Sequence, residues 1–169
     1  MSVTPLLKPI TQFSKELQKL AEAAVRAQRQ AYCPYSNFAV GAALQHSSSE
    51  ITVGCNYENC TLQSCCAERC AIVKANVEGK RTATAVAVYG APAGWQGVGD
   101  GTVVCPPCGL CRQLLVEVAD LSDNYNTFQV LLVSRDFQNG KLFLLRDLMI
   151  EKFGPADVGV DLAVLRQGK

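Results

Sequence analysis

Histidine and tryptophan are nearly absent from this chain of 169 residues, which has one of each, and neither sign of charge dominates. Sixteen basic against fifteen acidic residues leave a net charge of +1, and no run of Lys or Arg offers a stripe that would bind a phosphate backbone. No apolar run approaches the roughly 18 residues of a membrane span. Residues 1–5 lack the basic and apolar segments of a secretory signal. We therefore expect a cytoplasmic protein with a small-molecule partner, and neither nucleic acid nor membrane.

Cysteine is the exception to this scarcity, with nine residues in the chain. An odd number of cysteines without a secretory signal favours free thiols in a reducing compartment over a disulfide framework. Such thiols are available to bind metal, so the spacing between them is informative.

Two short motifs place three cysteines at the spacing of metal ligands. Residues 66–68 read Cys-Ala-Glu, and residues 107–111 read Pro-Cys-Gly-Leu-Cys. Catalytic zinc sites keep three protein ligands and leave the fourth position to water, whereas structural sites close with four. This pair of motifs is a form of the signature for hydrolytic deamination of a nucleobase. We predict one zinc ion per chain, bound by Cys66, Cys108 and Cys111.

Glu68 is the predicted catalytic residue. Attack at C4 of a cytosine ring needs a hydroxide, a protonated ring nitrogen and a protonated leaving amine. One carboxylate can take the proton from the water on zinc, pass it to N3 of the base, and later deliver a proton to the amine. On a regular helix, however, positions two apart point in nearly opposite directions. Cys66 must therefore lie at the irregular edge of the first helical turn.

A protein of a different class stays open at this point. A fourth thiolate, from Cys105 or from Cys65, would close the site and make the chain a structural zinc or thiol-switch module without catalysis. The only histidine, His46, lies in a polar turn and is expected to be exposed rather than a ligand. The remaining cysteines are expected to pack as small hydrophobes: Cys33, Cys55, Cys60 and Cys70.

Two arginines flank the predicted ligands. Three thiolates on a divalent ion leave the cluster with a single negative charge, which weakens the metal as a Lewis acid. Arg69 and Arg112 could donate hydrogen bonds to the ligand sulfurs and offset that charge. The alternative is that both are ordinary solvated arginines.

Apolar periodicity and turn residues divide the chain into alternating helices and strands. This order predicts an α/β fold, a three-layer sandwich in which helices cover a central mixed sheet. We expect a single domain over residues 1–169, with a core at about 14–155, a long glycine-rich loop at 91–102 and a tail at 156–169 without clear period. The predicted helices span 14–31, 66–77, 109–121 and 146–153; the predicted strands span 38–44, 51–57, 84–89, 128–133 and 141–145, the last two joined at an Asn-Gly turn.

Three further segments carry a likeness to a known family. Residues 32–43 read Tyr-Cys-Pro-Tyr-Ser-Asn-Phe-Ala-Val-Gly-Ala-Ala, residues 54–59 read Gly-Cys-Asn-Tyr-Glu-Asn, and residues 153–155 read Phe-Gly-Pro. Together with the metal motifs, they resemble in order the small zinc-dependent cytidine deaminases that act on free nucleosides. The likeness runs from about residue 14 to 155, most of the chain.

The resemblance implies an enzyme that hydrolyses free cytidine and deoxycytidine to uridine and deoxyuridine plus ammonia, in pyrimidine salvage. It also implies a homotetramer with shared active sites. By similarity, the substrate-binding residues have distinct tasks: Phe38 stacks near the base, Asn56 and Glu58 hydrogen-bond the ribose hydroxyl, the backbone of Ala67 holds the base edge, and Phe153 closes the pocket of a neighbouring subunit. Asn56 and Glu58 are two apart on an expected strand and would face the same side.

The chain departs from the family pattern at three places. The segment 59–66 is one residue shorter and lacks a tyrosine often found there, Pro106 stands where a small polar residue is common, and the loop 91–102 is longer than compact members need. An alternative within the same chemistry is a deaminase of a polynucleotide or of a cytosine-containing antibiotic. The ribose-type Asn56 and Glu58 and the missing basic stripe argue against it.

Overall fold

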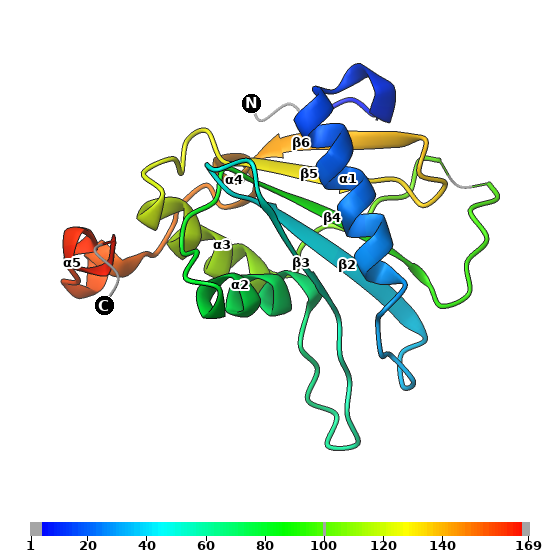
Figure 1. The fold of residues 1–169 in the computed structure, drawn as a ribbon, viewed down its shortest axis with the longest axis horizontal. Coiled ribbons are helices and arrows are strands. Elements are labelled where there is room, and N and C mark those ends of the chain that lie inside the picture. The colour runs from blue at the N-terminus through cyan, green and yellow to red at the C-terminus, as the bar shows by residue number, and fades with distance from the viewer. Residues whose placement is uncertain (1–4, 100, 167–169) are drawn as a thin grey trace.

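A six-stranded mixed sheet forms the centre of the protein in the computed structural model, which describes residues 5–99 and 101–166 (Figure 1). The strands stand in the order β1-β6-β5-β4-β2-β3, and β4 pairs with β5 in parallel while the other four pairings are antiparallel. The strands are β1 (Lys8–Pro9), β2 (Phe38–Gln45), β3 (Ile51–Cys55), β4 (Ala85–Pro92), β5 (Gln129–Val133) and β6 (Asn139–Leu144). The helices are α1 (Lys15–Gln28), α2 (Ala67–Val77), α3 (Gly109–Leu121), α4 (Leu145–Leu148) and α5 (Leu162–Arg166), with 3-10 turns at Ile10–Gln12 and Pro155–Val158.

Helix α1 covers one face of the sheet (Figure 1). The Ser14 side chain caps its start by accepting a hydrogen bond from the Leu17 N–H at 3.3 Å. Its apolar stripe, which includes Leu20 and Ala24, packs with the inward side chains of β2, β4 and β5.

Helices α2 and α3 cover the opposite face (Figure 1). Ala71 of α2 and Leu115 of α3 lie in one buried cluster with Val86 and Val88 of β4. Strand β4 is therefore buried on both faces, as its continuous run of small apolar residues requires. The predicted three-layer α/β sandwich is confirmed.

One glycine in β3 allows α2 to lie directly against the sheet. A Cβ atom at Gly54 would stand 2.4 Å from the Ala71 backbone nitrogen and 2.6 Å from the Ala67 carbonyl oxygen. No real side chain tolerates such contacts, so the close approach depends on glycine. The start of α2, where the first metal motif lies, is thereby fixed relative to β3.

Several predicted boundaries are wrong. The Asn-Gly pair at 139–140 begins β6 rather than forming the turn, because the preceding turn places Phe137 at a φ of 62° and Gly140 pairs with Val133. Strand β3 ends at Cys55, so Asn56 and Glu58 lie beyond it. The helix expected at 146–153 is the short α4, and the tail forms a 3-10 turn and α5. The two-residue β1, paired with β6, was not predicted.

His46 is buried, against the expectation of an exposed side chain. The residue is only 5% exposed. Its Nδ1 lies 2.7 Å from the Thr82 carbonyl oxygen, and its Nε2 lies 3.0 Å from Thr52 Oγ1. The polar turn that carries it folds back on the connection after α2, a tertiary contact that local polarity does not encode. Among the described residues, no helix has the length and apolarity to cross a membrane.

Candidate active site

The two metal motifs lie at the starts of neighbouring helices. Cys66 is the N-cap residue of α2, with extended backbone angles of −65° and 152°, and Cys108 is the N-cap residue of α3, at −66° and 170°. An N-cap residue lies outside the regular helix, so its side chain need not follow helical directions. Cys66 precedes the helix, and Glu68 lies within its first turn. The two side chains can therefore reach one site, although positions two apart within a regular helix point in nearly opposite directions.

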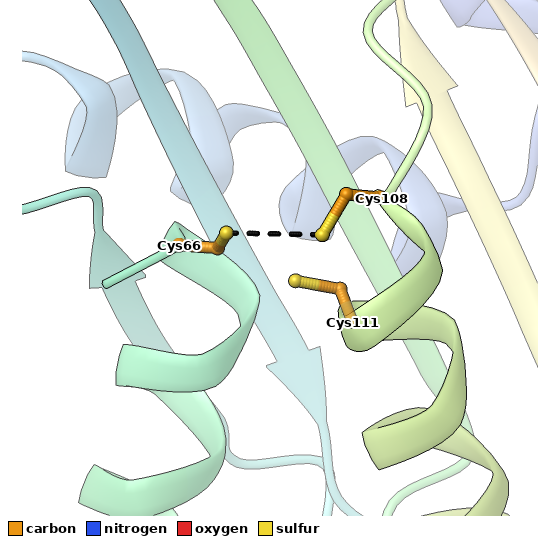
Figure 2. Close-up of side chains that lie close together, drawn as sticks. All are labelled: Cys66, Cys108 and Cys111. Atoms are coloured by element: carbon orange, nitrogen blue, oxygen red, sulfur yellow. Dashed lines mark hydrogen bonds between the residues drawn. The ribbon is translucent and has the colours of Figure 1, made fainter. Parts of the chain in front are cut away.

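The three cysteine sulfurs converge on one point between these helix starts (Figure 2). The potential ligand atoms of Cys66, Cys108 and Cys111 all lie within 4.8 Å of one another, and the first two sulfurs are 3.8 Å apart. Thiolates held at 2.3 Å around a tetrahedral zinc ion stand about 3.8 Å from each other. The donor set and its spacing therefore fit one tetrahedral metal ion.

The electrostatics of the three thiols depend on their burial and on the helix starts. Burial raises the pKa of Cys66 and, with the nearby Glu68 carboxylate as the second cause, that of Cys111. Burial also acts to raise the pKa of Cys108, but hydrogen bonds from the Cys111 and Leu110 backbone N–H groups and from the neighbouring thiols lower it overall. The N-terminus of α3 thus favours a thiolate at Cys108.

Glu68 lies beside this cluster and is almost enclosed. Its side chain is 3% exposed, and burial raises the pKa of its carboxyl group, while its own backbone N–H and the Cys111 thiol act in the opposite direction. A carboxyl group with a raised pKa can both accept and return a proton near neutral pH. Cys108 is exposed at the rim, so the cluster is accessible from one side.

Neither candidate fourth thiolate joins the cluster. Cys65 turns away from it: its sulfur lies 3.1 Å from that of Cys70 and accepts a hydrogen bond from Arg69 Nε at 3.1 Å. Cys105 lies over Gly90, where an added Cβ would be 2.8 Å from its sulfur. Burial raises the pKa of Cys105 to about 11. The donor group found among the described residues has three members, which leaves the fourth metal position open.

The profile of the family described as "Cytidine and deoxycytidylate deaminase zinc-binding region" matches residues 14–123, about two thirds of the chain. The chain belongs to this family. Its zinc-binding character accords with the three-cysteine cluster.

Individual relatives agree with this assignment. A cytidine deaminase of Halalkalibacterium halodurans is 41% identical over 102 residues, which are 60% of this chain and 70% of that protein. A probable cytidine deaminase of Dictyostelium discoideum is 39% identical over 107 residues, 63% of this chain and 67% of its own. The crystal structure of a cytidine deaminase from Burkholderia pseudomallei superimposes with a TM-score of 0.68 at 33% identity, over 83% of this chain and all of that one.

The residues that family resemblance links to the sugar are engaged within this chain. Asn56 Nδ2 donates to the Phe38 carbonyl oxygen at 2.9 Å, and Asn56 Oδ1 accepts from the Val40 N–H at 2.8 Å. Glu58 Oε2 accepts from the N–H groups of Tyr35 and Ser36 at 2.9 and 3.1 Å. Both side chains therefore shape the segment that carries Phe38.

The flanking arginines do not make the contacts predicted for them. Arg69 donates to Cys65 Sγ and to the Ser64 carbonyl oxygen, not to Cys66. Arg112 donates to the carbonyl oxygens of Pro107, at 2.9 Å, and Leu148, at 3.3 Å. Each guanidinium therefore braces the backbone beside a ligand.

The remaining predicted residues lie in different surroundings. Ala67 is fully buried at the first position of α2, and Phe38 is half-buried at the start of β2. Phe153 is 59% exposed, and its carbonyl oxygen accepts a hydrogen bond from Gln113 Nε2 at 2.6 Å. Cys60 is exposed, which corrects its expected burial.

Sequence reasoning missed Arg135, whose guanidinium carbon lies 5.9 Å from the centre of the Phe38 ring. No motif marks it, because its partners come from distant segments.

Proposed function

We propose that this protein hydrolyses the exocyclic amine of free cytidine and deoxycytidine, giving uridine or deoxyuridine and ammonia. The observation that carries the proposal is the convergence of three cysteine sulfurs beside a buried glutamate, with one side of the cluster open. Cys66, Cys108 and Cys111 would hold one zinc ion per chain. Membership of the deaminase family and the names of its relatives support the substrate.

Glu68 performs the proton transfers in this proposal. Zinc, when bound, makes a coordinated water acidic enough to act as a nucleophile near neutral pH. The Glu68 carboxylate would accept one proton of the attacking water and deliver it to N3 as the C4–O bond forms. It would then take the proton of the new C4 hydroxyl and pass it to the amine, so that the C4–N bond breaks and ammonia leaves. Its enclosed position, 3% exposed, keeps bulk water from competing for the proton.

The substrate-binding residues divide the work between base and sugar. Phe38 lies along the base, the backbone of Ala67 holds its polar edge, and Asn56 and Glu58 hold the ribose hydroxyl. The existing hydrogen bonds of Asn56 and Glu58 to residues 35–40 support this assignment, since they would order the sugar and Phe38 sides of one pocket together. Arg69 and Arg112 brace the ligand-bearing backbone.

We also propose a homotetramer with shared active sites. Residues 56–65, here called the arm, extend away from the body of the chain (Figure 1), and Leu62 at its end is 77% exposed. A groove of about 400 Å³ between α2 and α3 is lined largely by apolar side chains. These features and the exposed Phe153 offer apolar surface to a second copy. Light scattering of the purified protein gives the mass directly, and Phe153→Ala mixed with Glu68→Gln would recover activity only if subunits share a site.

We propose one domain over residues 1–169, acting in the cytoplasm in pyrimidine salvage. Packing of the C-terminal segment on α3 supports the single domain: Lys152 pairs with Asp120, and Arg166 donates to the Asp120 carbonyl oxygen at 2.7 Å.

The decisive experiment is ultraviolet-monitored conversion of free cytidine by the zinc-loaded protein. Glu68→Gln is the matched control, because it keeps the side-chain size and removes the titrating group. We expect turnover by the wild type and a loss of about 10²–10⁴-fold in the variant, with zinc and uridine binding retained. Equal turnover by both proteins would remove Glu68 from the mechanism. No turnover, with zinc at one per chain, would favour a polynucleotide or antibiotic substrate.

A further inference from the structure

The Arg135 guanidinium lies over two aromatic rings. Its central carbon is 5.9 Å from the centre of the Phe38 ring and 6.0 Å from that of Trp95. Both distances fall within the range of cation–π contacts. The three residues come from separate segments: the start of β2, the glycine-rich loop after β4, and the turn between β5 and β6. We call Trp95, Arg135 and Phe38 the aromatic stack.

The backbone of Arg135 is held on both sides. Its N–H donates to the Val103 carbonyl oxygen at 3.0 Å, and its carbonyl oxygen accepts from the Tyr89 hydroxyl at 2.9 Å. The preceding residue, Ser134, forms an antiparallel bridge with Val104. The guanidinium therefore extends from a fixed point rather than from a free turn.

The glycine-rich loop is joined to the segment before Phe38. The Ala93 N–H donates to the carbonyl oxygen of Asn37 at 2.7 Å, and Asn37 has a positive φ of 55°. Two residues later, Trp95 packs against the cluster under α1. The loop thus contacts the Phe38 region through its backbone and, by way of Arg135, through Trp95.

One edge of the Phe38 ring lies on the side of Cys105. A Cβ at Gly90 would lie 3.0 Å from Phe38 Cε1 and 2.8 Å from Cys105 Sγ, so the ring edge and this thiol share one small space. After burial, the Glu68 carboxylate is the second cause that raises the pKa of Cys105. The aromatic stack therefore begins at the loop and ends beside the proposed pocket.

We infer that Trp95 and Arg135 are positioning residues, which hold the Phe38 ring where it meets the base of the substrate. The inference rests on the proposed function, in which Phe38 lies along that base. It gives the loop 91–102 a role in substrate binding. Because a displaced Phe38 weakens contact with substrate and transition state alike, the effect belongs in KM rather than in kcat.

Steady-state kinetics with cytidine tests this on Arg135→Gln, Arg135→Lys and Trp95→Leu. We expect KM to rise by about three- to tenfold for each, with kcat within about twofold of the wild type. Lysine keeps the charge but lacks the planar guanidinium, so it should not restore KM. Arg146→Gln, at an exposed position on α4, is the control and should leave both constants unchanged. Three outcomes would overturn the positioning role of the stack. They are an unchanged KM in Arg135→Gln, a wild-type KM in Arg135→Lys, and a change confined to a lower kcat.

Trp95 also provides a readout that is independent of turnover, because it is the only tryptophan in the chain. Titration of the zinc-loaded protein with uridine should change its fluorescence saturably, and Arg135→Gln should shift the midpoint to higher uridine. Suppose that the wild type turns over cytidine, but uridine does not change its fluorescence and the variants have the KM of the wild type. The positioning role of the stack is then wrong, and the proposed function stands. If the wild type does not turn over cytidine, the proposed function fails; the fluorescence shift then supports the stack and its absence overturns it.

Discussion

The starts of α2 and α3 differ from the arm in whether their functional groups are already hydrogen-bonded within the chain. The two regions are nevertheless adjacent in the sequence, joined at residues 65 and 66. In the arm, polar side chains satisfy one another and the backbone: Asn56 uses both ends of its amide, Glu58 accepts two N–H groups, and Cys65 accepts from Arg69. At the helix starts, three sulfurs face a common point with Glu68 beside them. Groups left facing each other can bind a metal or move a proton. Groups already hydrogen-bonded within the chain hold its structure and leave only their remaining donors and lone pairs for the ribose.

The two carboxylates make the same contrast in their pKa values. Hydrogen bonds from Ser36, first from its side chain, lower the pKa of Glu58 despite the opposing effect of burial. Burial raises the pKa of Glu68. Glu58 is therefore held as a charged acceptor, and Glu68 can exchange its proton. Residue type alone does not separate these roles; the number of donors around each carboxylate does.

The largest expected effect is a difference in zinc content between two variants, in which the adjacent Cys65 and Cys66 are each replaced by alanine. Cys66→Ala removes a proposed ligand, so zinc should fall well below one per chain, cytidine turnover should drop to background and the protein should lose the stability that metal binding provides. Cys65→Ala removes a thiol that contacts Cys70 and Arg69, so zinc should remain at one per chain. Metal analysis by mass spectrometry measures the zinc per chain in both purified variants and so shows which of the two cysteines is the ligand.

The reverse result, with zinc lost in Cys65→Ala and kept in Cys66→Ala, would exchange the two roles. Cys108→Ala serves as the positive control for ligand loss, because Cys108 comes from the other helix start and its sulfur lies 3.8 Å from that of Cys66.

A smaller effect is expected on acid stability when Glu58 is replaced. Its folded-state pKa lies below its ordinary value of 4.5, so the stability it contributes is fully present above that value and is lost as pH falls through the lowered pKa. Glu58→Gln should therefore be less stable than the wild type at pH 7, and the difference should shrink in acid. Urea unfolding of the zinc-free proteins at pH 7 and below pH 4.5 measures this, with exposed Glu22→Gln of α1 as control. A constant difference between variant and wild type across that range would contradict it.

The helix starts could be predicted from sequence because their chemistry is local. The Cys-x-Glu and Pro-Cys-x-x-Cys spacings and the alternation of helices and strands need only short windows of sequence. The requirement that Cys66 stand at an irregular edge also followed from helix geometry, and its place as the N-cap residue of α2 meets it.

The contacts that sequence could not give all join distant segments. His46 lies in a polar turn, yet its burial depends on Thr82, 36 residues away. Arg135 meets Phe38 and Trp95 only after β2, β4 and β5 have paired. The Asn-Gly pair at the start of β6 has the composition of a turn, but pairing with β1 and β5 places it in a strand. In each case tertiary contact overrides a local preference.

The smallest expected effect comes from replacing Cys105, and it tests whether this thiol is a packed side chain or a metal ligand. Cys105 lies near the metal cluster, with its sulfur packed over Gly90 rather than directed at the other thiols. Cys105→Ala should therefore keep one zinc per chain and retain cytidine turnover, while the lost packing lowers the free energy of unfolding by about 1 kcal/mol. Metal analysis and urea unfolding measure the two quantities on the same sample. Loss of zinc would instead identify a closed four-thiolate site, which has no position for water and would turn the protein from a catalyst into a structural zinc module.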